Sequence, residues 1–269
     1  ALNVSGRSII ASSKEEAARI IKFYQDEGIN NIDLGLAQIG LFVAGYALSA
    51  GIIAGFESVL TTYFQPRLYR DANAINPQSR TDAWRRYADA VVPSLVLTVG
   101  LLIAMAPDLT RLLLGERFQD AASYVIWGAF AEAGRVLASV YSLIAHVHRR
   151  TRWLIWPNVA GACVSIVGCV IWIPVLGAHG AGLAMAAAAV LTILTMHFAL
   201  SKKVGARMSP RPIIASMVLM PAMIGLAMLL RRSLPADPWI TPLLTCSIMG
   251  LAFLCLQYLM LRNHLNDAS

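Results

Sequence analysis

The chain has 269 residues, of which 57% are hydrophobic and only 14% are charged. Soluble domains average about a quarter charged residues, so this composition excludes an ordinary water-soluble globule, and it equally excludes a disordered chain. The net charge of +7 and the pI near 9.5 would also suit a nucleic-acid-binding protein. The positions of the basic residues therefore have to decide between these classes.

Five windows contain no Asp, Glu, Lys or Arg and are candidates for membrane spans. They hold 21 residues at 36–56, 18 at 90–107, 49 at 153–201, 19 at 212–230 and 24 at 238–261. A bilayer core of about 30 Å needs about 20 helical residues, so the longest window has room for two spans. We expect the turn between them at 173–180, where Pro174, Gly177 and Gly180 break the helix.

A further span is expected at about 118–148, although this stretch contains Asp120, Glu132 and Arg135. The sequence thus predicts an all-α, polytopic membrane bundle of seven helices, at about 35–63, 88–107, 120–147, 153–174, 180–200, 212–230 and 239–261. Residues 1–34 are too charged to span, and they predict either a short amphipathic helix at the interface or a soluble extension. Because the chain begins at Ala1 without a methionine, we expect it to be part of a longer protein.

The basic residues alternate from one connection to the next. Connections 64–87, 147–152 and 201–211, together with Arg262, contain 13 Lys and Arg residues, whereas the intervening connections contain 4, namely Arg111, Arg117, Arg231 and Arg232. Such an imbalance is typical of cytoplasmic loops that carry positive charge. The basic loops are therefore predicted to be cytoplasmic, and a nucleic-acid partner is not expected.

Three stretches carry a resemblance to a known family. They are 42–48 (FVAGYAL) with 63–69 (YFQPRLY), 107–122 (PDLTRLLLGERFQDAA), and 158–184, in which an Asn-led helix of small residues is followed by Ile-Pro, Gly and then GAGLA. Their order and spacing resemble the C-terminal half of bacterial flippases for lipid-linked polysaccharide and O-antigen precursors. That family belongs to the superfamily of the multidrug and oligosaccharidyl-lipid exporters. The resemblance covers about residues 34–230.

The resemblance implies a fold and an activity. It implies one lobe of a 14-helix exporter in the bacterial inner membrane, with six helices at 35–230 and a last transmembrane helix and short cytoplasmic tail at 231–269. The family's first six helices are absent from the chain, and its seventh helix would fall on the charged segment 1–33. The implied activity is not enzymatic and needs no cofactor. It is the movement of an undecaprenyl-pyrophosphate-linked glycan from the cytoplasmic to the periplasmic leaflet by alternating access, with the lipid bilayer, a polysaccharide polymerase and glycosyltransferases as partners.

One predicted helix carries a polar stripe. Its members recur every three or four residues, at Gly128, Glu132, Arg135, Ser139, Ser142 and His146. Because a charge in the middle of the bilayer costs at least about 2.5 kcal/mol, the stripe must face the bundle interior or a wet cavity. Arg135 is then either a cation that binds a pyrophosphate or acidic sugar, or a partner of Glu132 that only orients helices. Asn158, Ser165 and Cys169 share a face of the next helix and are expected to border the same cavity.

Other polar and small residues support narrower predictions. Glu57 is expected to be either a gate residue or, preferably, a charge at the cytoplasmic rim near Arg67. Asp89 is expected at the N-terminus of the second span, where the helix dipole favours an acid, and it is also a candidate gate or rim residue. Gly51 and Gly55 form a Gly-x-x-x-Gly step that predicts close helix packing.

Two alternative functions remain open. A drug or cation antiporter of the same superfamily would share the fold, and a cavity dominated by acidic groups would favour it over a balanced Glu132–Arg135 pair. A membrane-embedded glycosyl- or acyltransferase of polysaccharide synthesis is the alternative from the enzyme class. The sequence contains no phosphate-binding loop of the Gly-x-x-x-x-Gly-Lys-Ser/Thr type and no Cys or His spacing typical of a metal site.

Overall fold

The computed structural model describes residues 2–4, 7–9, 32–72, 77–234, 237 and 239–266. Within these ranges the chain is an all-α bundle, apart from a short antiparallel pair of strands, β1 (Leu2–Val4) and β2 (Arg7–Ile9). Most of the segment 1–34, predicted to be a short amphipathic helix at the interface or a soluble extension, lies outside the described residues.

Seven long helices follow, joined by two 3₁₀ turns. They are α2 (Ile32–Ala72), α3 (Pro77–Leu114), η1 (Glu116–Ala121), α4 (Ala122–Val147), η2 (Thr151–Leu154), α5 (Ile155–Leu176), α6 (Ala178–Val204), α7 (Pro210–Ser233) and α8 (Ile240–Asn266). Each predicted helix has its counterpart here. Six of the seven are long and apolar enough to cross a membrane, which makes this a multi-pass membrane protein. The exception is α4, which contains Glu132 and Arg135.

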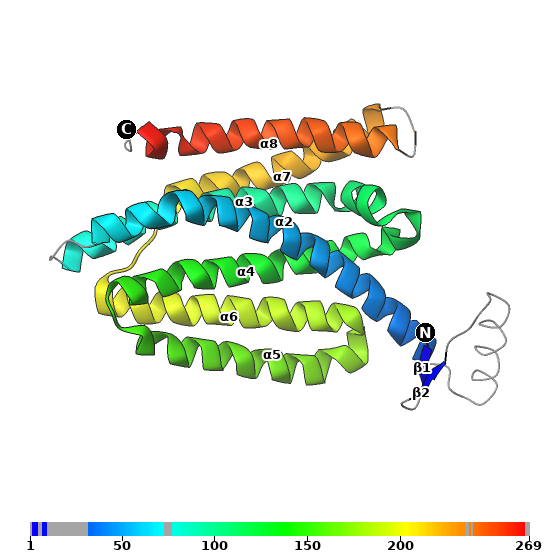
Figure 1. The fold of residues 1–269 in the computed structure, drawn as a ribbon, viewed down its shortest axis with the longest axis horizontal. Helices are drawn as coiled ribbons and strands as arrows, with labels where there is room; N and C mark the ends of the chain where they lie inside the picture. Colours follow the sequence, from blue (N-terminus) through cyan, green and yellow to red (C-terminus); the bar gives the residue numbers. More distant parts are fainter. Residues whose placement is uncertain are drawn as a thin grey trace.

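The helices lie side by side along the long axis, with α2 crossing over α3 and α4 (Figure 1). α3 is the central helix, because it contacts α2, α4, α7 and α8. In its most apolar stretch 78% of the residues are buried, against 11–22% in the other five apolar helices. Those five therefore leave broad apolar faces uncovered by protein, as expected of helices that face lipid.

The first two helices extend beyond the predicted spans. The region 64–87, predicted as a loop, is helical except at 73–76, which lies outside the described residues. Leu60, Phe64, Leu68 and Ala72 recur every four residues along α2 and are all buried. This stripe packs the extension of α2 against the bundle, so the helix continues where the charge-free window ends.

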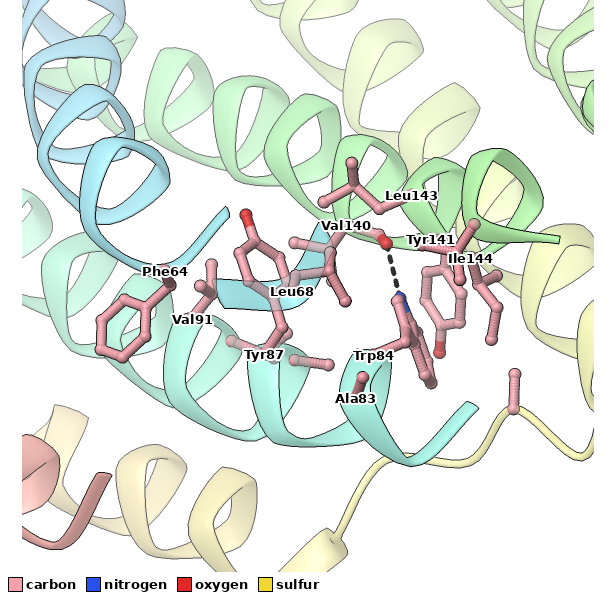
Figure 2. Packing of buried hydrophobic residues seen from close by; sticks show 14 of the residues in the cluster. Phe64, Leu68, Ala83, Trp84, Tyr87, Val91, Val140, Tyr141, Leu143 and Ile144 are labelled. Carbon is pink, nitrogen blue, oxygen red and sulfur yellow. Dashed lines mark hydrogen bonds between the residues drawn. The ribbon is translucent and has the colours of Figure 1, made fainter. Parts of the chain in front are cut away.

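The extensions of α2 and α3 form a core with the last turns of α4 (Figure 2). Trp84 is fully buried at its centre, and its indole N–H donates a hydrogen bond of 2.8 Å to the carbonyl oxygen of Val140. Tyr141 lies beside the indole with ring centroids 5.7 Å apart, and its hydroxyl is 2.8 Å from Nδ1 of His197 on α6. This core holds three helices and α6 together at the basic end of the bundle.

The tight turn between α5 and α6 is where the sequence predicts it, although its cause differs. Pro174 lies inside the last turn of α5, and Pro221 lies inside α7, so neither proline breaks its helix. The chain reverses at Gly177, whose φ of 58° suits glycine. A Cβ on Gly180 would lie 2.3 Å from the carbonyl oxygen of Trp172, so only glycine permits this approach of α6 to α5.

The predicted packing role of Gly51 and Gly55 is wrong. A Cβ on either residue would meet nothing within 4 Å. The close approach of α2 to α4 uses other glycines: a Cβ on Gly45 would lie 2.6 Å from the oxygen of Ala121, and one on Gly128 would lie 3.0 Å from Ser49. A Gly-x-x-x-Gly step alone does not show which face of a helix is packed.

Polar contacts hold the C-terminal end of α7 and the start of α8. Near the end of α7, Arg231 donates to the buried carboxylate of Asp108 on α3, with Nε and Nη2 at 2.9 and 2.6 Å. The carboxylate of Asp237 accepts the backbone N–H groups of Trp239 and Ile240 at 2.9 Å, and these bonds lower its pKa. Arg231, counted from the sequence among the loop charges, is thus a packing residue.

Asp89 is not at the N-terminus of its own helix, because α3 begins 12 residues earlier, at Pro77. Its carboxylate accepts the backbone N–H and the hydroxyl of Ser209, at 2.9 and 2.6 Å. Ser209 is the residue that precedes α7, so Asp89 ties the start of α7 to α3. The acid does sit near a helix N-terminus, but that of α7 and not of its own helix.

Replacing Gly180 by alanine is expected to destabilise the bundle, because the methyl group would meet backbone atoms of Trp172 that cannot turn aside. Overpacking of this kind costs about 1–3 kcal/mol. Gly55→Ala is the control, and it should be neutral or slightly stabilising because its Cβ meets open space and alanine favours a helix. Thermal unfolding of both purified variants in detergent measures the difference, and equal midpoints would contradict this account of the turn.

Trp84→Ala is expected to cost about 3 kcal/mol or more, because it opens a void in the core and leaves the Val140 carbonyl without its indole donor. Trp156 on α5 is the matched control, since 79% of its surface is exposed and its loss should have little effect. Unfolding midpoints of the two alanine variants in the same detergent provide the comparison. A similar loss in both variants would show that Trp84 is not a specific anchor.

Candidate functional site

A cluster of three charged side chains lies between α2 and α4. Arg135 on α4 donates from Nε to Oε2 of Glu132, one turn earlier on the same helix, at 2.7 Å. From Nη2 it donates to Oε2 of Glu57 on α2, also at 2.7 Å. The pairing of Glu132 with Arg135 is confirmed, and Glu57 joins it from a position 78 residues away in the chain. We call Glu57, Glu132 and Arg135 the charged cluster.

The charged cluster is held by neighbouring contacts between the same two helices. The hydroxyl of Tyr46 on α2 donates to Oε1 of Glu132, so both oxygens of that carboxylate are bonded. One turn along α2, the hydroxyl of Ser49 donates to the carbonyl oxygen of Val125 at 2.7 Å. The absence of a side chain at Gly128 lets α2 come this close. These contacts fix the position of Glu132. Within the charged cluster, Arg135 is the residue with donors left for a further ligand.

Burial differs sharply among the three side chains. Glu132 is 7% exposed and Glu57 is 19% exposed, whereas Arg135 is 48% exposed. Two carboxylates and one guanidinium give the cluster a formal charge of −1, so the pair expected from the sequence is present but a second carboxylate unbalances it. Glu57 is paired with Arg135 between α2 and α4, and α2 continues for 15 residues beyond it to Ala72. Its role as a gate residue or as a charge at the cytoplasmic rim stays a prediction.

The exposed side of Arg135 borders a cavity of about 500 Å³ between α4, α5 and α6. The polar groups of its wall come from all three helices: Arg135, Ser139, Ser142, Asn158, Ser165 and Thr192. Four predicted site residues, Arg135, Ser139, Ser142 and Asn158, are thus brought together, and Ser165 joins them. Cys169 is not in this wall. Glu57 and Ser139 also line a narrow crevice between α2, α3 and α4.

Glycines in the wall of this cavity allow α4 and α5 to pack closely against α6. A Cβ on Gly161 would lie 2.0 Å from the hydroxyl oxygen of Thr192, and one on Gly134 would lie 2.3 Å from the Cβ of Ala189. Three polar side chains of the wall donate to backbone oxygens that lie close by in the chain. Ser142 donates to the oxygen of Ser139, Asn158 to that of Leu154 and Thr192 to that of Ala188. Because a charged donor makes stronger hydrogen bonds than a neutral one, Arg135 is the strongest donor in the wall.

The predicted gate or rim residue Asp89 is not part of this site, because its carboxylate is bonded to Ser209 at the start of α7. Tyr46 is a functional candidate that the sequence analysis missed, because nothing in the sequence singles it out. Glu57 was singled out as a charge in an otherwise apolar helix, but its pairing with Arg135 was not predicted. No group of three or more His, Cys, Asp or Glu residues that could hold a metal ion occurs in the described parts of the chain.

Comparisons with family models, with curated proteins and with solved structures gave no match to this chain. The assignment of a function therefore depends on the site itself and on the sequence resemblance.

Arg135→Ala is expected to destabilise the protein, because it leaves the carboxylates of Glu57 and Glu132 close together without their cation. The cost should be about 2 kcal/mol, less than for a fully buried pair because the guanidinium is half exposed. Adding Glu57→Gln to Arg135→Ala should recover part of this loss. Unfolding midpoints in detergent measure both effects, with the exposed Arg262→Ala as control.

If the double variant were no more stable than Arg135→Ala, the two carboxylates would not repel each other in the absence of the guanidinium. The assignment of Arg135 as the group that holds Glu57 and Glu132 together would then be wrong.

Proposed function

We propose that this chain forms one lobe of a flippase that moves a lipid-linked oligosaccharide across the bacterial inner membrane. The single observation that carries the proposal is the position of Arg135, a half-exposed cation at the edge of a cavity of about 500 Å³ inside a membrane bundle. A charge inside a membrane bundle needs partners. Glu132 and Glu57 supply them, and the part of the guanidinium that they leave exposed faces the cavity. The size of the cavity lies within the range of about 300–1,000 Å³ that is usual for ligand sites.

The donor inventory of Arg135 supports an anionic ligand. A guanidinium has five N–H donors in a planar fork that suits phosphate and carboxylate oxygens. In the described structure two of the five bond to Glu132 and Glu57. The other three remain for a pyrophosphate or an acidic sugar. Glu132 and Glu57 would then orient the guanidinium, in the way that supporting carboxylates usually hold a binding arginine.

The arrangement of the helices supports transport from the cytoplasm outward. The ends of α2, α4, α6 and α8 lie at the same end of the bundle (Figure 1). The connections at this end contain the basic residues, which by the positive-inside rule makes it the cytoplasmic end. In the exporters that the sequence resembles, two such lobes rock against each other, so a substrate bound near Arg135 would be released at the opposite face.

A drug or cation antiporter is the second candidate, because the charged cluster contains two acids and one base. A proton or metal cation could take the place of part of the arginine's charge in such a cluster. The geometry favours this candidate less, since both carboxylates are largely covered whereas the guanidinium faces the cavity. In an antiporter the acids would be the groups that meet the substrate.

Export of the glycan should depend on the charge and shape of residue 135. In a flippase-deficient strain that expresses the complete product of this gene, Arg135→Lys should retain part of the surface polysaccharide because the charge remains. Arg135→Ala should lose it at normal membrane abundance. The control is Arg262→Ala, an exposed residue near the end of α8, which should export normally. Surface polysaccharide is measured by gel staining, and protein abundance by immunoblot.

Unchanged export in the alanine variant at equal abundance would contradict the proposal. Loss of cation or drug efflux from Glu57→Gln cells, without loss of surface polysaccharide, would instead favour the antiporter.

A further inference from the structure

A second cavity, of about 560 Å³, opens at the end of the bundle opposite the basic connections. Its polar wall comes from four elements: Gln38 of α2, Gln119 and Asp120 of η1, Ser123 and Tyr124 of α4, and His179 at the start of α6. These residues play no part in the charged cluster. No lysine or arginine is present in the described lining.

One wall is a fixed aromatic surface. The imidazole of His179 stacks on the ring of Tyr124, with centroids 4.6 Å apart and an interplanar angle of 25°. The indole N–H of Trp127 donates to Nδ1 of His179 at 3.2 Å. Since Nδ1 accepts this bond, the neutral imidazole carries its proton on Nε2, which makes Nε2 a donor. Phe42 meets the other side of Tyr124 edge-on at 5.7 Å.

The cavity is built into the packed end of the bundle. A Cβ on Gly177, in the turn between α5 and α6, would lie 2.9 Å from Oε1 of Gln38, so the amide of Gln38 lies directly over this turn. A Cβ on Gly182 would lie 2.7 Å from the indole of Trp127. These contacts hold α2 and α6 in fixed positions on either side of α4. The amide side chain and the aromatic surface are therefore presented by packed helices.

The chemistry of the lining selects among ligand classes. A phosphate or uronic acid is disfavoured, because the carboxylate of Asp120 repels an anion and none of the described lining residues is a lysine or arginine. A bare metal ion is disfavoured, because calcium takes six to eight oxygen ligands and Asp120 is the one carboxylate among the described lining residues. A largely apolar ligand would leave two amides, a carboxylate and a hydroxyl without partners.

A sugar ring matches both parts of the wall. The two glutamine amides and the Asp120 carboxylate can each bridge neighbouring hydroxyl groups, since each has paired polar atoms. An aromatic surface can pack on the apolar C–H face of a pyranose ring. The volume of about 560 Å³ exceeds what one ring needs and has room for more than one.

We propose that this cavity is a binding site for a neutral hexopyranose unit of a glycan. Gln38, Gln119 and Asp120 bond to its hydroxyl groups, and the exposed imidazole of His179, which Tyr124 supports from behind, packs on its face. The inference uses residues other than those of the proposed function and does not depend on it. If the protein is a flippase, this cavity is where the leading sugars of the glycan are held at the far side of the membrane from Arg135.

Saturation-transfer NMR on the full chain in lipid nanodiscs tests this site. The probes are the methyl glycosides of glucose, galactose, N-acetylglucosamine and glucuronic acid. We expect transfer to at least one neutral glycoside, strongest at ring C–H protons, and none to the glucuronide. Gln38→Ala and Asp120→Ala should each weaken the affinity about tenfold, the effect of losing roughly one good hydrogen bond. Gln65→Ala, the same residue type at the other end of α2, is the matched control.

Absence of transfer to every neutral glycoside would overturn the proposal, as would transfer that persists unchanged in Gln38→Ala and Asp120→Ala. Preferential binding of the glucuronide, or competition by millimolar Ca²⁺ without any sugar binding, would also overturn it. Unchanged near-UV circular dichroism must accompany each variant. Binding that survives Arg135→Ala, in a protein that no longer exports, would show that this site holds even if the transport proposal fails.

Discussion

The structure depends on a constraint that lipid imposes: the three charged side chains inside the bundle must pair with one another. Neither Glu57 nor Glu132 can face hydrocarbon, and Arg135 lies between them at 2.7 Å from each. This requirement decides which faces of α2 and α4 meet. Glycines at 45 and 128 then allow the two backbones to approach closely. The same geometry leaves the open side of the guanidinium toward the cavity of α4, α5 and α6, so one arrangement stabilises the fold and forms the candidate site.

The two cavities divide the polar chemistry of the protein. One has an arginine beside hydroxyl groups, two of which, on Ser142 and Thr192, donate within their own helices, and it suits an anion. The other has amides, a carboxylate and stacked rings, and it suits an uncharged polyol. A lipid-linked oligosaccharide contains both kinds of group, a charged pyrophosphate and a hydroxyl-rich glycan. Two separate sites of different chemistry fit a ligand that is long and chemically uneven along its length.

The helices and their order could be predicted from the sequence because apolar windows report directly on what lipid tolerates. The pairing of Glu132 with Arg135 could also be predicted, since residues three apart on a helix are neighbours. The pairing of Arg135 with Glu57 could not be predicted, because the two residues are 78 positions apart and meet only through the packing of α2 on α4. The lengths of α2 and α3 were underestimated for a related reason. A charge-free window predicts only the part of a helix that can lie in lipid. The buried stripe of Leu60, Phe64, Leu68 and Ala72 extends α2 further, because it packs against protein. Pro174 and Gly51 misled because residue type alone does not specify a kink or a contact face.

α4 differs from the other six long helices of the described chain in being too polar to count as a membrane span. A charged residue at the centre of an isolated span costs at least about 2.5 kcal/mol, and pairing with a group of opposite charge removes part of that cost. Glu57 of α2 precedes Arg135 of α4 along the chain, so the partner of this charge is synthesised first. The stability of α4 in a membrane therefore depends on α2, and the order of the helices supplies that partner before it is needed.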